Sequence, residues 1–339
     1  MTTNPIIIGG AGVLGLWQAL TLAEAGNEVR LVDASNEPFT TSASRYGGAM
    51  IAPECEAEAA PTIVRDLGRT SLERWQSVYP ELTVRGTLVV AAARDRPELA
   101  RFGRMTETHR PVDAAGISAL EPELGQRFPA GLFFPSEAHM SAPDALAALL
   151  SRVRQAGVDV RFGTRLPDAA ARGTTLIDCR GLDAGELLPD LRGVRGERLI
   201  VRAPDVTLTR PLRLLHPRHP LYVVPWREHL YMIGATVIES EDAGPATLRS
   251  ALELMGAAYA LHPAFGEAEI VEIGAGVRPA FPDNVPRIIV RDDPVDGGRR
   301  ILVNGAYRHG FLLAPILADA VAAIVAGAPG ALRHPLAAA

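Results

Sequence analysis

Three glycines near the N-terminus have the spacing of a phosphate-binding turn. Gly10, Gly12 and Gly15 follow an apolar run at residues 6–8 and begin an apolar-periodic stretch that stops at Gly26. In a G-x-G-x-x-G turn the first glycine permits a tight bend, the second lets the backbone approach a pyrophosphate, and the third allows close packing of helix on strand. The helix N-terminus then offers free N–H groups and a positive dipole to the anion, which predicts dinucleotide binding.

An acidic residue supports the same ligand. Residues 28–33 read as a second short strand that ends in Asp33, 18 positions beyond Gly15. A carboxylate at this place would accept hydrogen bonds from an adenosine ribose. Strand, turn, helix and strand together make one βαβ unit, whose two strands should be parallel neighbours. The unit by itself does not distinguish NAD from FAD.

The absence of lysine narrows the remaining chemistry. The chain has 339 residues and 34 basic side chains, all of which are arginine. Schiff-base formation, a P-loop lysine and lysine-linked carriers are excluded, because a guanidinium cannot replace an amine in any of these roles. A codon bias across the genome is the simplest cause, and the exclusion holds either way. Any cation in a functional site must therefore be arginine.

Composition and charge exclude further classes of protein. With 47% apolar and 22% charged residues, a chain of this length should form two globular domains rather than a disordered or fibrous structure. The net charge is −5 and the arginines are scattered among 39 carboxylates, which disfavours a nucleic-acid partner. Cys55 and Cys179 form no CxxC pair, so neither a disulfide framework nor a metal site is indicated, and a reducing cytoplasm is expected.

Two segments resemble membrane signals, but we interpret neither of them as one. Residues 1–5 carry no basic side chain, so a secretory signal is not indicated. Residues 311–326 contain Pro315 and Asp319 and fall short of the ~20 residues that a membrane span needs. We therefore expect a buried helix there and no membrane span.

The middle of the chain contains several short hydrophobic patterns that are typical of helices and strands. They predict a helix over residues 60–79, a strand over 84–92, one strand at 132–134 among short helices, a helix from Ser141 to Gly157, and parallel strands at 158–162 and 175–178. Alternation then predicts antiparallel strands at 199–201, 221–224 and 230–233. The strands of these two kinds indicate two separate sheets.

The C-terminal part combines one further amphipathic helix with strand and helix patterns like those of the N-terminal βαβ unit. One helix should bury Leu248, Leu252, Met255 and Tyr259 on its apolar face. A strand at 301–303 and a turn at 304–305 precede a helix that begins near Gly310, and the alanine-rich tail should fray. The sequence thus predicts an α/β fold in which a discontinuous Rossmann-like domain (residues 1–82, 142–185 and 274–339) carries an antiparallel-sheet α+β domain (83–141 and 186–273).

Several motifs along the chain resemble one family. Together with the first βαβ unit they are RYGGAMIAP at 45–53 with Glu56 and Glu58 after it, GER at 196–198, IGAT at 233–236, GVRP at 276–279 and GAYRHGFLLAP at 305–315. In this order they resemble the D-amino-acid oxidase family of FAD-dependent oxidoreductases, and within it the glycine oxidases that supply dehydroglycine for the thiamine thiazole ring. The resemblance runs from about Ile6 to Val325.

The resemblance implies non-covalent FAD and a set of residues that hold it. Contacts with the adenine, ribose and pyrophosphate or with the flavin ring are implied for Gly10, Gly12, Val13, Leu14, Gly15, Asp33, Ala34, Thr41, Ser42, Arg45, Gly47, Gly48, Ala49, Leu166, Ala306, Tyr307, Arg308, His309, Gly310, Phe311 and Leu312. The dipole of the helix that begins at Gly310 would favour the negative charge that develops on the flavin when it is reduced.

The resemblance also implies how the substrate is bound. Arg278 follows a strand at 269–277 and precedes Pro279, and in the family this arginine takes the substrate carboxylate in a bidentate fork. Arg308 and Tyr222 match further positions of the substrate pocket. His139 and His309 are candidates for acid–base chemistry, although packing is the commoner role of a single histidine.

The implied reaction requires no certain catalytic side chain. Hydride leaves the substrate's α-carbon for the flavin, the product is an imine, and oxygen is then reduced to hydrogen peroxide. Sarcosine, a D-amino acid or proline as substrate and a quinone as acceptor are alternatives within the family. An FAD-binding component of tRNA modification and an NAD dehydrogenase are alternatives outside it, and a homo-oligomer is compatible with the sequence.

Overall fold

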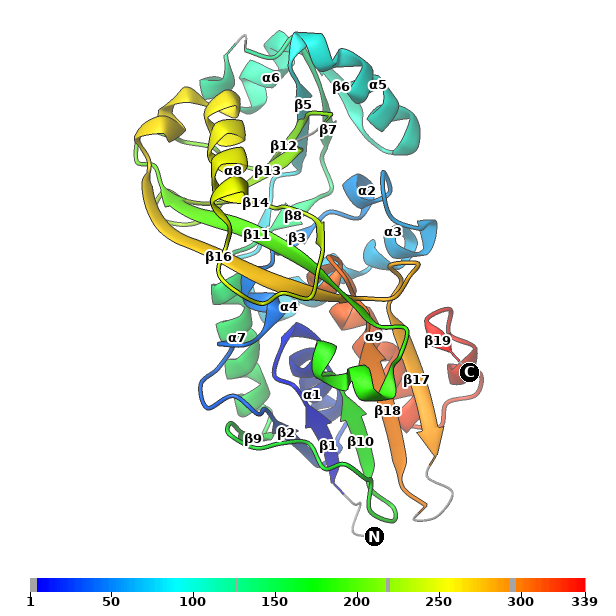
Figure 1. The fold of residues 1–339 in the computed structure, drawn as a ribbon. Coiled ribbons are helices and arrows are strands. Elements are labelled where there is room, and N and C mark those ends of the chain that lie inside the picture. The colour runs from blue at the N-terminus through cyan, green and yellow to red at the C-terminus, as the bar shows by residue number, and fades with distance from the viewer. Residues whose placement is uncertain (1–4, 126, 218–219, 293–296, 339) are drawn as a thin grey trace.

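A mostly parallel sheet forms the lower part of the molecule (Figure 1). The computed structural model describes residues 5–125, 127–217, 220–292 and 297–338. The sheet contains, in spatial order, β19 (Ala337–Ala338), β17 (Arg287–Asp292), β18 (Arg299–Asn304), β10 (Thr175–Asp178), β1 (Ile6–Gly9), β2 (Val29–Val32) and β9 (Asp159–Arg161). The predicted parallel pairing of β1 with β2 is confirmed, with β10 on the other side of β1.

Three helices bury the apolar side chains of this sheet. They are α1 (Val13–Glu24), α7 (Ala142–Gln155) and α9 (Gly310–Val325), and their inner faces join the strands in the largest core cluster. The predicted cap of α7 is confirmed, because the Ser141 hydroxyl accepts a hydrogen bond from the backbone N–H of Asp144. The predicted buried helix at 311–326 is α9. Within the described residues no helix is both long and apolar enough to cross a membrane.

The upper sheet is larger and mainly antiparallel. Its strands are β5 (Thr87–Ala91), β6 (Arg110–Asp113), β7 (Ala130–Phe134), β11 (Arg192–Arg202), β12 (Leu212–Leu215), β13 (Leu221–Pro225), β14 (Leu230–Gly234), β15 (Ile238–Glu239) and β16 (Glu269–Ala280). The helices α5 (Arg96–Met105), α6 (Ala114–Leu120) and α8 (Leu248–Leu261) lie beside it (Figure 1). The predicted strands at 199–201, 221–224 and 230–233 are confirmed as antiparallel neighbours.

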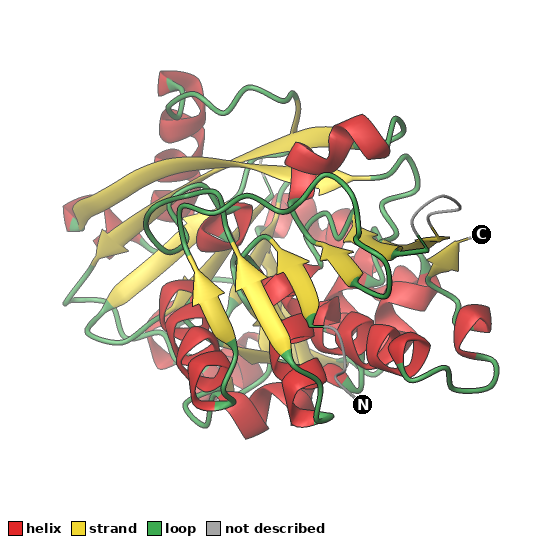
Figure 2. Cartoon of the chain, turned by 90° about the horizontal axis from the view of Figure 1, so that it is seen from below, coloured by secondary structure: helices red, strands yellow, loops and turns green. Residues whose placement is uncertain are grey.

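Short elements join the two sheets. A small sheet pairs β3 (Met50–Ile51) and β4 (Thr83–Val84) with β8 (Ala138–His139). The helices α2 (Pro53–Glu56), α3 (Thr62–Gly68) and α4 (Ser71–Val78) follow β3. In Figure 2 the parallel strands point toward the long strands of the upper sheet. Ligands of open α/β sheets bind at the carboxyl ends of the strands, so the region between the sheets is where a site is expected.

The helix predicted over residues 60–79 is wrong as a single element. The chain forms α3 and α4, with a break at Arg69 and Thr70. Both helices pack on α9, and a Cβ on Gly68 would lie 2.8 Å from the Leu312 side chain. The strand predicted over 84–92 is likewise interrupted at Gly86, which has a φ of +75° and is therefore in the left-handed region that glycine favours.

The predicted apolar face of α8 is also wrong, except for Met255, which is half-buried and packs against the core. Leu248 is 77% exposed and Leu252 is 61% exposed, and Tyr259 is exposed as well. The helix instead buries Ala251, Leu254, Ala258 and Leu261, because its alanines allow a close approach to the sheet. The tail is not frayed where it is described: Ala337 and Ala338 pair with β17, and the carbonyl of buried Leu336 accepts a hydrogen bond from the Ile288 N–H at 2.8 Å.

The two sheets follow the predicted division of the chain closely, apart from one strand. Every strand of the lower sheet lies within residues 1–82, 142–185 or 274–339. The upper sheet uses residues 83–141 and 186–273, but β16 continues to Ala280 without a break. The assignment of these segments to two domains stays a prediction, and β16 would connect them.

Candidate functional site

The glycine turn adopts the conformation that its spacing predicts. Gly10 has a φ of +94°, and a Cβ there would lie 2.7 Å from the carbonyl oxygen of Cys179. A Cβ on Gly15 would lie 1.8 Å from the carbonyl oxygen of Gly10. No real side chain tolerates such a distance, so both positions require glycine for steric reasons. The turn joins β1 to α1, as the sequence indicates.

The N-terminus of α1 retains the positive end of its helix dipole. Gly12 caps it without a side chain, and its first turn contains no acidic residue, so the positive end of the helix dipole is not neutralised from within. The Ser44 hydroxyl accepts a hydrogen bond from Val13 N–H at 3.1 Å, and the Asp33 carboxylate accepts one from Ala11 N–H at 2.6 Å. The sequence reasoning missed Ser44, which lies in a serine-rich loop without a distinctive spacing.

Ten of the predicted cofactor residues belong to this region. They lie in the turn, in the first turn of α1, at the end of β2 and in the loop that follows it, or against β1: Gly10, Gly12, Val13, Leu14, Gly15, Asp33, Ala34, Thr41, Ser42 and Leu166. A Cβ on Gly12 would come within 3.3 Å of the hydroxyl oxygens of both Ser42 and Ser44. A Cβ on Gly9 would contact Leu166 at 2.8 Å.

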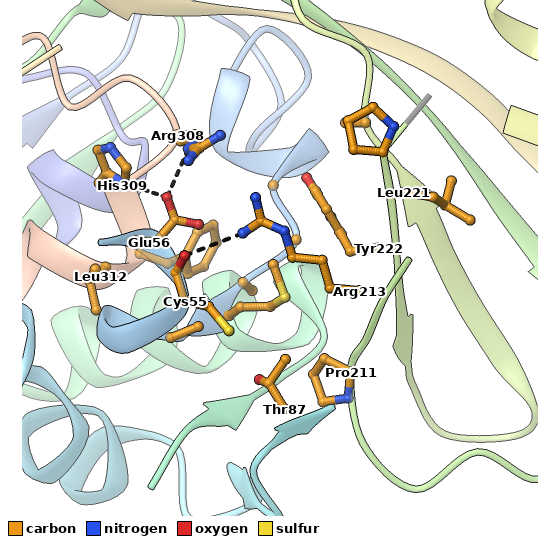
Figure 3. A pocket seen from close by; sticks show the side chains of 18 of the residues that line it. Cys55, Glu56, Thr87, Pro211, Arg213, Leu221, Tyr222, Arg308, His309 and Leu312 are labelled. Carbon is orange, nitrogen blue, oxygen red and sulfur yellow. Dashed lines mark hydrogen bonds and ion pairs between the residues drawn. The ribbon is translucent and has the colours of Figure 1, made fainter. Parts of the chain in front are cut away.

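A pocket lies between the two sheets (Figure 3), with an empty volume of about 1040 Å³ that includes its open mouth. Nine of the predicted residues line it: Gly47, Gly48, Ala49, Tyr222, Arg278, Arg308, His309, Phe311 and Leu312. Ala306, Tyr307 and Gly310 belong to the same loop and helix start as the last four of them. Two predicted groups of residues are thus brought together, one at the glycine turn and one around this pocket.

Arg278 enters the pocket from within β16, since the strand continues to Ala280 rather than ending at Val277. Its guanidinium lies over Gly196 on the neighbouring strand β11, where a Cβ would approach Nη2 at 2.0 Å. Nη1 donates a hydrogen bond to the Thr236 carbonyl at 3.3 Å. Among the described residues, no carboxylate pairs with Arg278. The glycine of the GER motif therefore makes room for a cation that lacks a counter-ion.

Glu56 holds two of the other predicted residues. Its Oε2 accepts a hydrogen bond from Arg308 Nε at 2.7 Å and lies 3.2 Å from His309 Nδ1 (Figure 3). Burial alone would raise the pKa of Glu56, but Arg308, His309 and Arg213 outweigh it and hold that pKa well below its usual range. Glu56 is therefore a carboxylate, and it compensates the charge of Arg308.

Arg213 is a third arginine in the pocket, and the sequence reasoning missed it. It lies on β12 directly opposite Tyr222 on β13, so both side chains project from the same face of the sheet. Leu212 and Leu214 point to the other face, into the core beneath α8. Glu58 Oε2 accepts a hydrogen bond from Arg213 Nη2 at 3.0 Å. Only the tertiary structure brings Arg213 and Glu58 together, so no local sequence pattern could have identified this ion pair.

Tyr222 lies among all of these charges. Burial raises the pKa of its hydroxyl, and Arg278, Glu56, Arg308 and Arg213 all act on it electrostatically. The neutral phenol can therefore donate a hydrogen bond into the pocket over the whole physiological pH range. Thr87, Cys55 and Met50 complete the less polar part of the wall, and none of them was predicted.

Two of the predicted residues lie elsewhere. His139 is buried in β8, where its backbone pairs with β3 and β4, and it does not line the pocket. Burial lowers the pKa of His139 to about 4, which fits a neutral packing residue. Arg45 directs its guanidinium to Glu272 on β16 at 3.5 Å, so it too lies off the pocket wall. The suggested chemistry at His139 has no support in this geometry.

The start of α9 forms one wall of the pocket. His309 caps the helix without a side-chain hydrogen bond, and the first turn holds no acidic residue. Trp75 fixes this turn, because its Nε1 donates a hydrogen bond to the Phe311 carbonyl at 2.7 Å and its ring stacks on Phe311. A second helix dipole is thereby directed at the site, next to that of α1, since a Cβ on Gly310 would lie 3.4 Å from the Val13 side chain. Among the described residues no cluster of His, Cys, Asp and Glu could hold a metal ion.

Comparisons with known proteins agree with this arrangement. The family model of FAD-dependent oxidoreductases named DAO matches residues 5–324. A thiamine biosynthesis oxidoreductase, ThiO, of Rhizobium etli is 47% identical over 94% of this chain and 95% of its own length. A glycine oxidase of Pseudomonas aeruginosa is 26% identical over 95% of this chain and 94% of its own. The crystal structure of a glycine oxidase from Bacillus cereus has the same fold, with a TM-score of 0.81 at 20% identity over 98% of both chains.

Proposed function

The chain belongs to the DAO family of FAD-dependent oxidoreductases, and from that premise we propose that it oxidises glycine or a similarly small amino acid to the imine. Oxygen would be the electron acceptor and hydrogen peroxide the second product. The name of the Rhizobium etli relative supports a further part of the proposal, in which the imine supplies thiamine thiazole synthesis.

One observation carries the choice of substrate class. Arg278 offers a guanidinium with no carboxylate partner among the described residues, in a pocket whose other arginines are paired. A guanidinium binds a carboxylate through two parallel hydrogen bonds, and in a partly dry pocket such charged bonds are strong. The site is therefore suited to a small molecule with one carboxylate. Tyr222 would add a hydrogen bond beside it.

The chain's own residues fit FAD at both ends of the site. The turn needs glycine at Gly10 and Gly15 to bend and to pack, and the N-terminus of α1, which has no acidic residue in its first turn, would hold the pyrophosphate. Asp33 would accept hydrogen bonds from the ribose, and the start of α9 would face the flavin ring. Arg308 Nη2 is buried without a hydrogen-bond partner among the described residues, as expected if a bound group completes its contacts. Bound FAD supplies the two-electron acceptor for the oxidation.

Arg278, Tyr222 and Glu56 would contribute by position and charge. A carboxylate on Arg278 fixes the orientation of the amino group and the α-carbon, which lowers the entropic part of the barrier. Glu56 keeps Arg308 and His309 in place at the pocket wall. No side chain is required to take a proton from carbon, because a hydride leaves it. The neutral amine is the reactive form, so substrate ionisation will shape the pH profile.

Anaerobic addition of glycine to the FAD-loaded protein tests the proposal most directly. We expect the visible absorbance of the flavin to bleach, as in any two-electron reduction of FAD, and hydrogen peroxide to form when air is admitted. A panel with sarcosine, D-alanine and proline as substrates ranks the amines. Bleaching by proline or a D-amino acid but not by glycine would contradict the substrate that we propose, and reduction without hydrogen peroxide would contradict oxygen as acceptor.

Gly47→Ala should weaken FAD binding. A Cβ at this position would lie 2.9 Å from the ring of Phe311, which cannot move easily because it stacks on Trp75. Such overpacking costs about 1–3 kcal/mol, and it would displace the start of α9 from the pocket wall. We expect a lower ratio of flavin to protein after purification and a lower melting temperature.

Gly185→Ala is the matched control for Gly47→Ala. A Cβ on Gly185 meets no atom within 4 Å, so this variant should retain the flavin content and melting temperature of the parent. Equal flavin content in both variants would show that the contact between Gly47 and Phe311 does not shape the cofactor site.

A further inference from the structure

Arg213 reaches the pocket but is already bound by the protein. Its Nη2 donates to Glu58 Oε2 at 3.0 Å, and its Nη1 donates to the Cys55 carbonyl at 3.3 Å. The guanidinium also lies over the Phe102 ring, 4.9 Å from the ring centroid. Figure 3 shows Arg213 between Tyr222 and the Glu56 carboxylate. Its charge thus faces the pocket on one side, and Glu58 holds it on the other.

Glu58 does not line the pocket and is fixed from outside it. Its second oxygen, Oε1, accepts a hydrogen bond from Arg101 Nη2 at 2.6 Å. Arg101 lies on α5 and is in turn paired with Glu98 at 3.1 Å. Glu58 is largely buried, with a side-chain exposure of 12%. Two arginines therefore hold this carboxylate in a single position behind Arg213.

The charges around the pocket can be counted from these pairs. Arg308 is compensated by Glu56 and Arg213 by Glu58, whereas Arg278 has no carboxylate partner among the described residues. Three cations face two anions, so one positive charge remains. A ligand with one carboxylate balances it. A second carboxylate would have to compete with Glu58 for Arg213 while it lies close to Glu56, and such like-charge repulsion is costly in a partly buried site.

We propose that Glu58 determines the substrate class by neutralising Arg213, so that the pocket accepts amino acids with one carboxylate and rejects those with two. The inference rests on the proposed function in one respect, namely that Arg278 takes the substrate carboxylate. Glu58 acts through Arg213 and not by contact with the substrate, so it is a specificity-determining residue outside the site. Its removal would create a second free cation close to the first.

Binding of two inert anions to the FAD-loaded enzyme tests this inference without turnover. Acetate carries one carboxylate and malonate carries two. Each anion is titrated separately into the enzyme, and its affinity is measured from the change in the flavin spectrum. The wild-type enzyme should bind malonate no more tightly than acetate. Glu58→Gln should bind malonate roughly tenfold more tightly, as one charged hydrogen bond gained predicts, while its affinity for acetate changes less than about threefold.

Two further variants locate the effect. Glu98→Gln removes the other partner of Arg101 and leaves Glu58 in place, so it should keep the wild-type preference. The double variant Glu58→Gln/Arg213→Met should lose the gain in malonate affinity, because the freed cation is gone. A gain that survives in the double variant would show that another group binds the second carboxylate, and the inference would be wrong.

The remaining outcomes also decide the question. If wild-type enzyme already prefers malonate by tenfold, Arg213 is not neutralised and the inference falls, even where Glu58→Gln fails to fold. It falls as well if a folded Glu58→Gln keeps the wild-type ratio, or if wild-type enzyme binds neither anion. Failure of glycine to reduce the flavin contradicts the proposed function alone, since the anion titrations do not depend on which amine is oxidised.

Discussion

Replacing Arg278 by alanine should raise the KM for glycine by roughly tenfold to a hundredfold, because charged hydrogen bonds to a carboxylate contribute about 1.5–3 kcal/mol. The guanidinium is the one described pocket cation without a carboxylate partner, and Gly196 leaves room for it. The value of kcat should fall less, since the oxidation itself takes place on the cofactor. Steady-state hydrogen peroxide formation over a wide range of glycine concentrations gives both constants.

Arg278→Lys and Arg202→Ala are the comparisons for this variant. Lysine keeps the charge but not the fork, so Arg278→Lys should fall between the wild-type enzyme and the alanine variant. Arg202 is an exposed arginine at the end of β11, and its loss should leave the KM unchanged. An unchanged KM in a folded, FAD-loaded Arg278→Ala would remove the basis for the substrate that we propose.

Glu137→Gln should stabilise the protein at pH 8 by an amount on the order of 3 kcal/mol. Glu137 is fully buried. Its Oε1 accepts a hydrogen bond from Cys55 N–H at 2.7 Å, whereas its Oε2 has no hydrogen-bond partner among the described residues. Burial raises the pKa of Glu137 to about 7. A glutamine preserves the shape and the acceptor for Cys55 and has no charge to bury.

The pH dependence of this effect has a definite sign. A carboxyl whose pKa is raised in the folded state contributes stability that is fully present below its unfolded pKa, near 4.5, and that is lost as the pH rises through about 7. The melting temperatures of the wild type and Glu137→Gln should therefore coincide near pH 4.5 and diverge until pH 7 to 8. Glu28→Gln, at an exposed position, should show no such divergence. Parallel curves for Glu137→Gln and the wild type would mean that Glu137 stays ionised in the folded protein.

The parts of the site that the sequence predicts are those built from contiguous residues. The turn from Gly10 to Gly15 is a local structure, because its steric requirements involve the turn itself and one neighbouring strand. The helix caps at Ser141 and Gly12 are local in the same sense. The residues at 47–49 and 306–312 could be placed only through a family resemblance, and the structure does place most of them at one pocket.

The parts that the sequence does not predict depend on distant partners. Arg213 and Glu58 are 155 positions apart, and nothing in either segment indicates that they meet. The orientation of α8 depended on which of two apolar faces the sheet selects, and small alanines packed better than the larger Leu248 and Leu252. His139 was predicted as an acid–base candidate from its residue type alone. It lies in a short strand between two others and does not line the pocket.

The pocket wall includes Arg278 and Tyr222 from the upper sheet and Arg308 and Phe311 from the chain that follows β18 of the lower sheet. A ligand that fills the pocket would therefore contact both halves of the molecule at once. A ligand that binds only when the pocket wall is complete stabilises the folded protein relative to any state in which the two halves have separated. Binding at this site and the stability of the native fold are then thermodynamically linked. In a cell, the supply of substrate would thus protect this enzyme against proteolysis, and starvation for it would shorten the enzyme's lifetime.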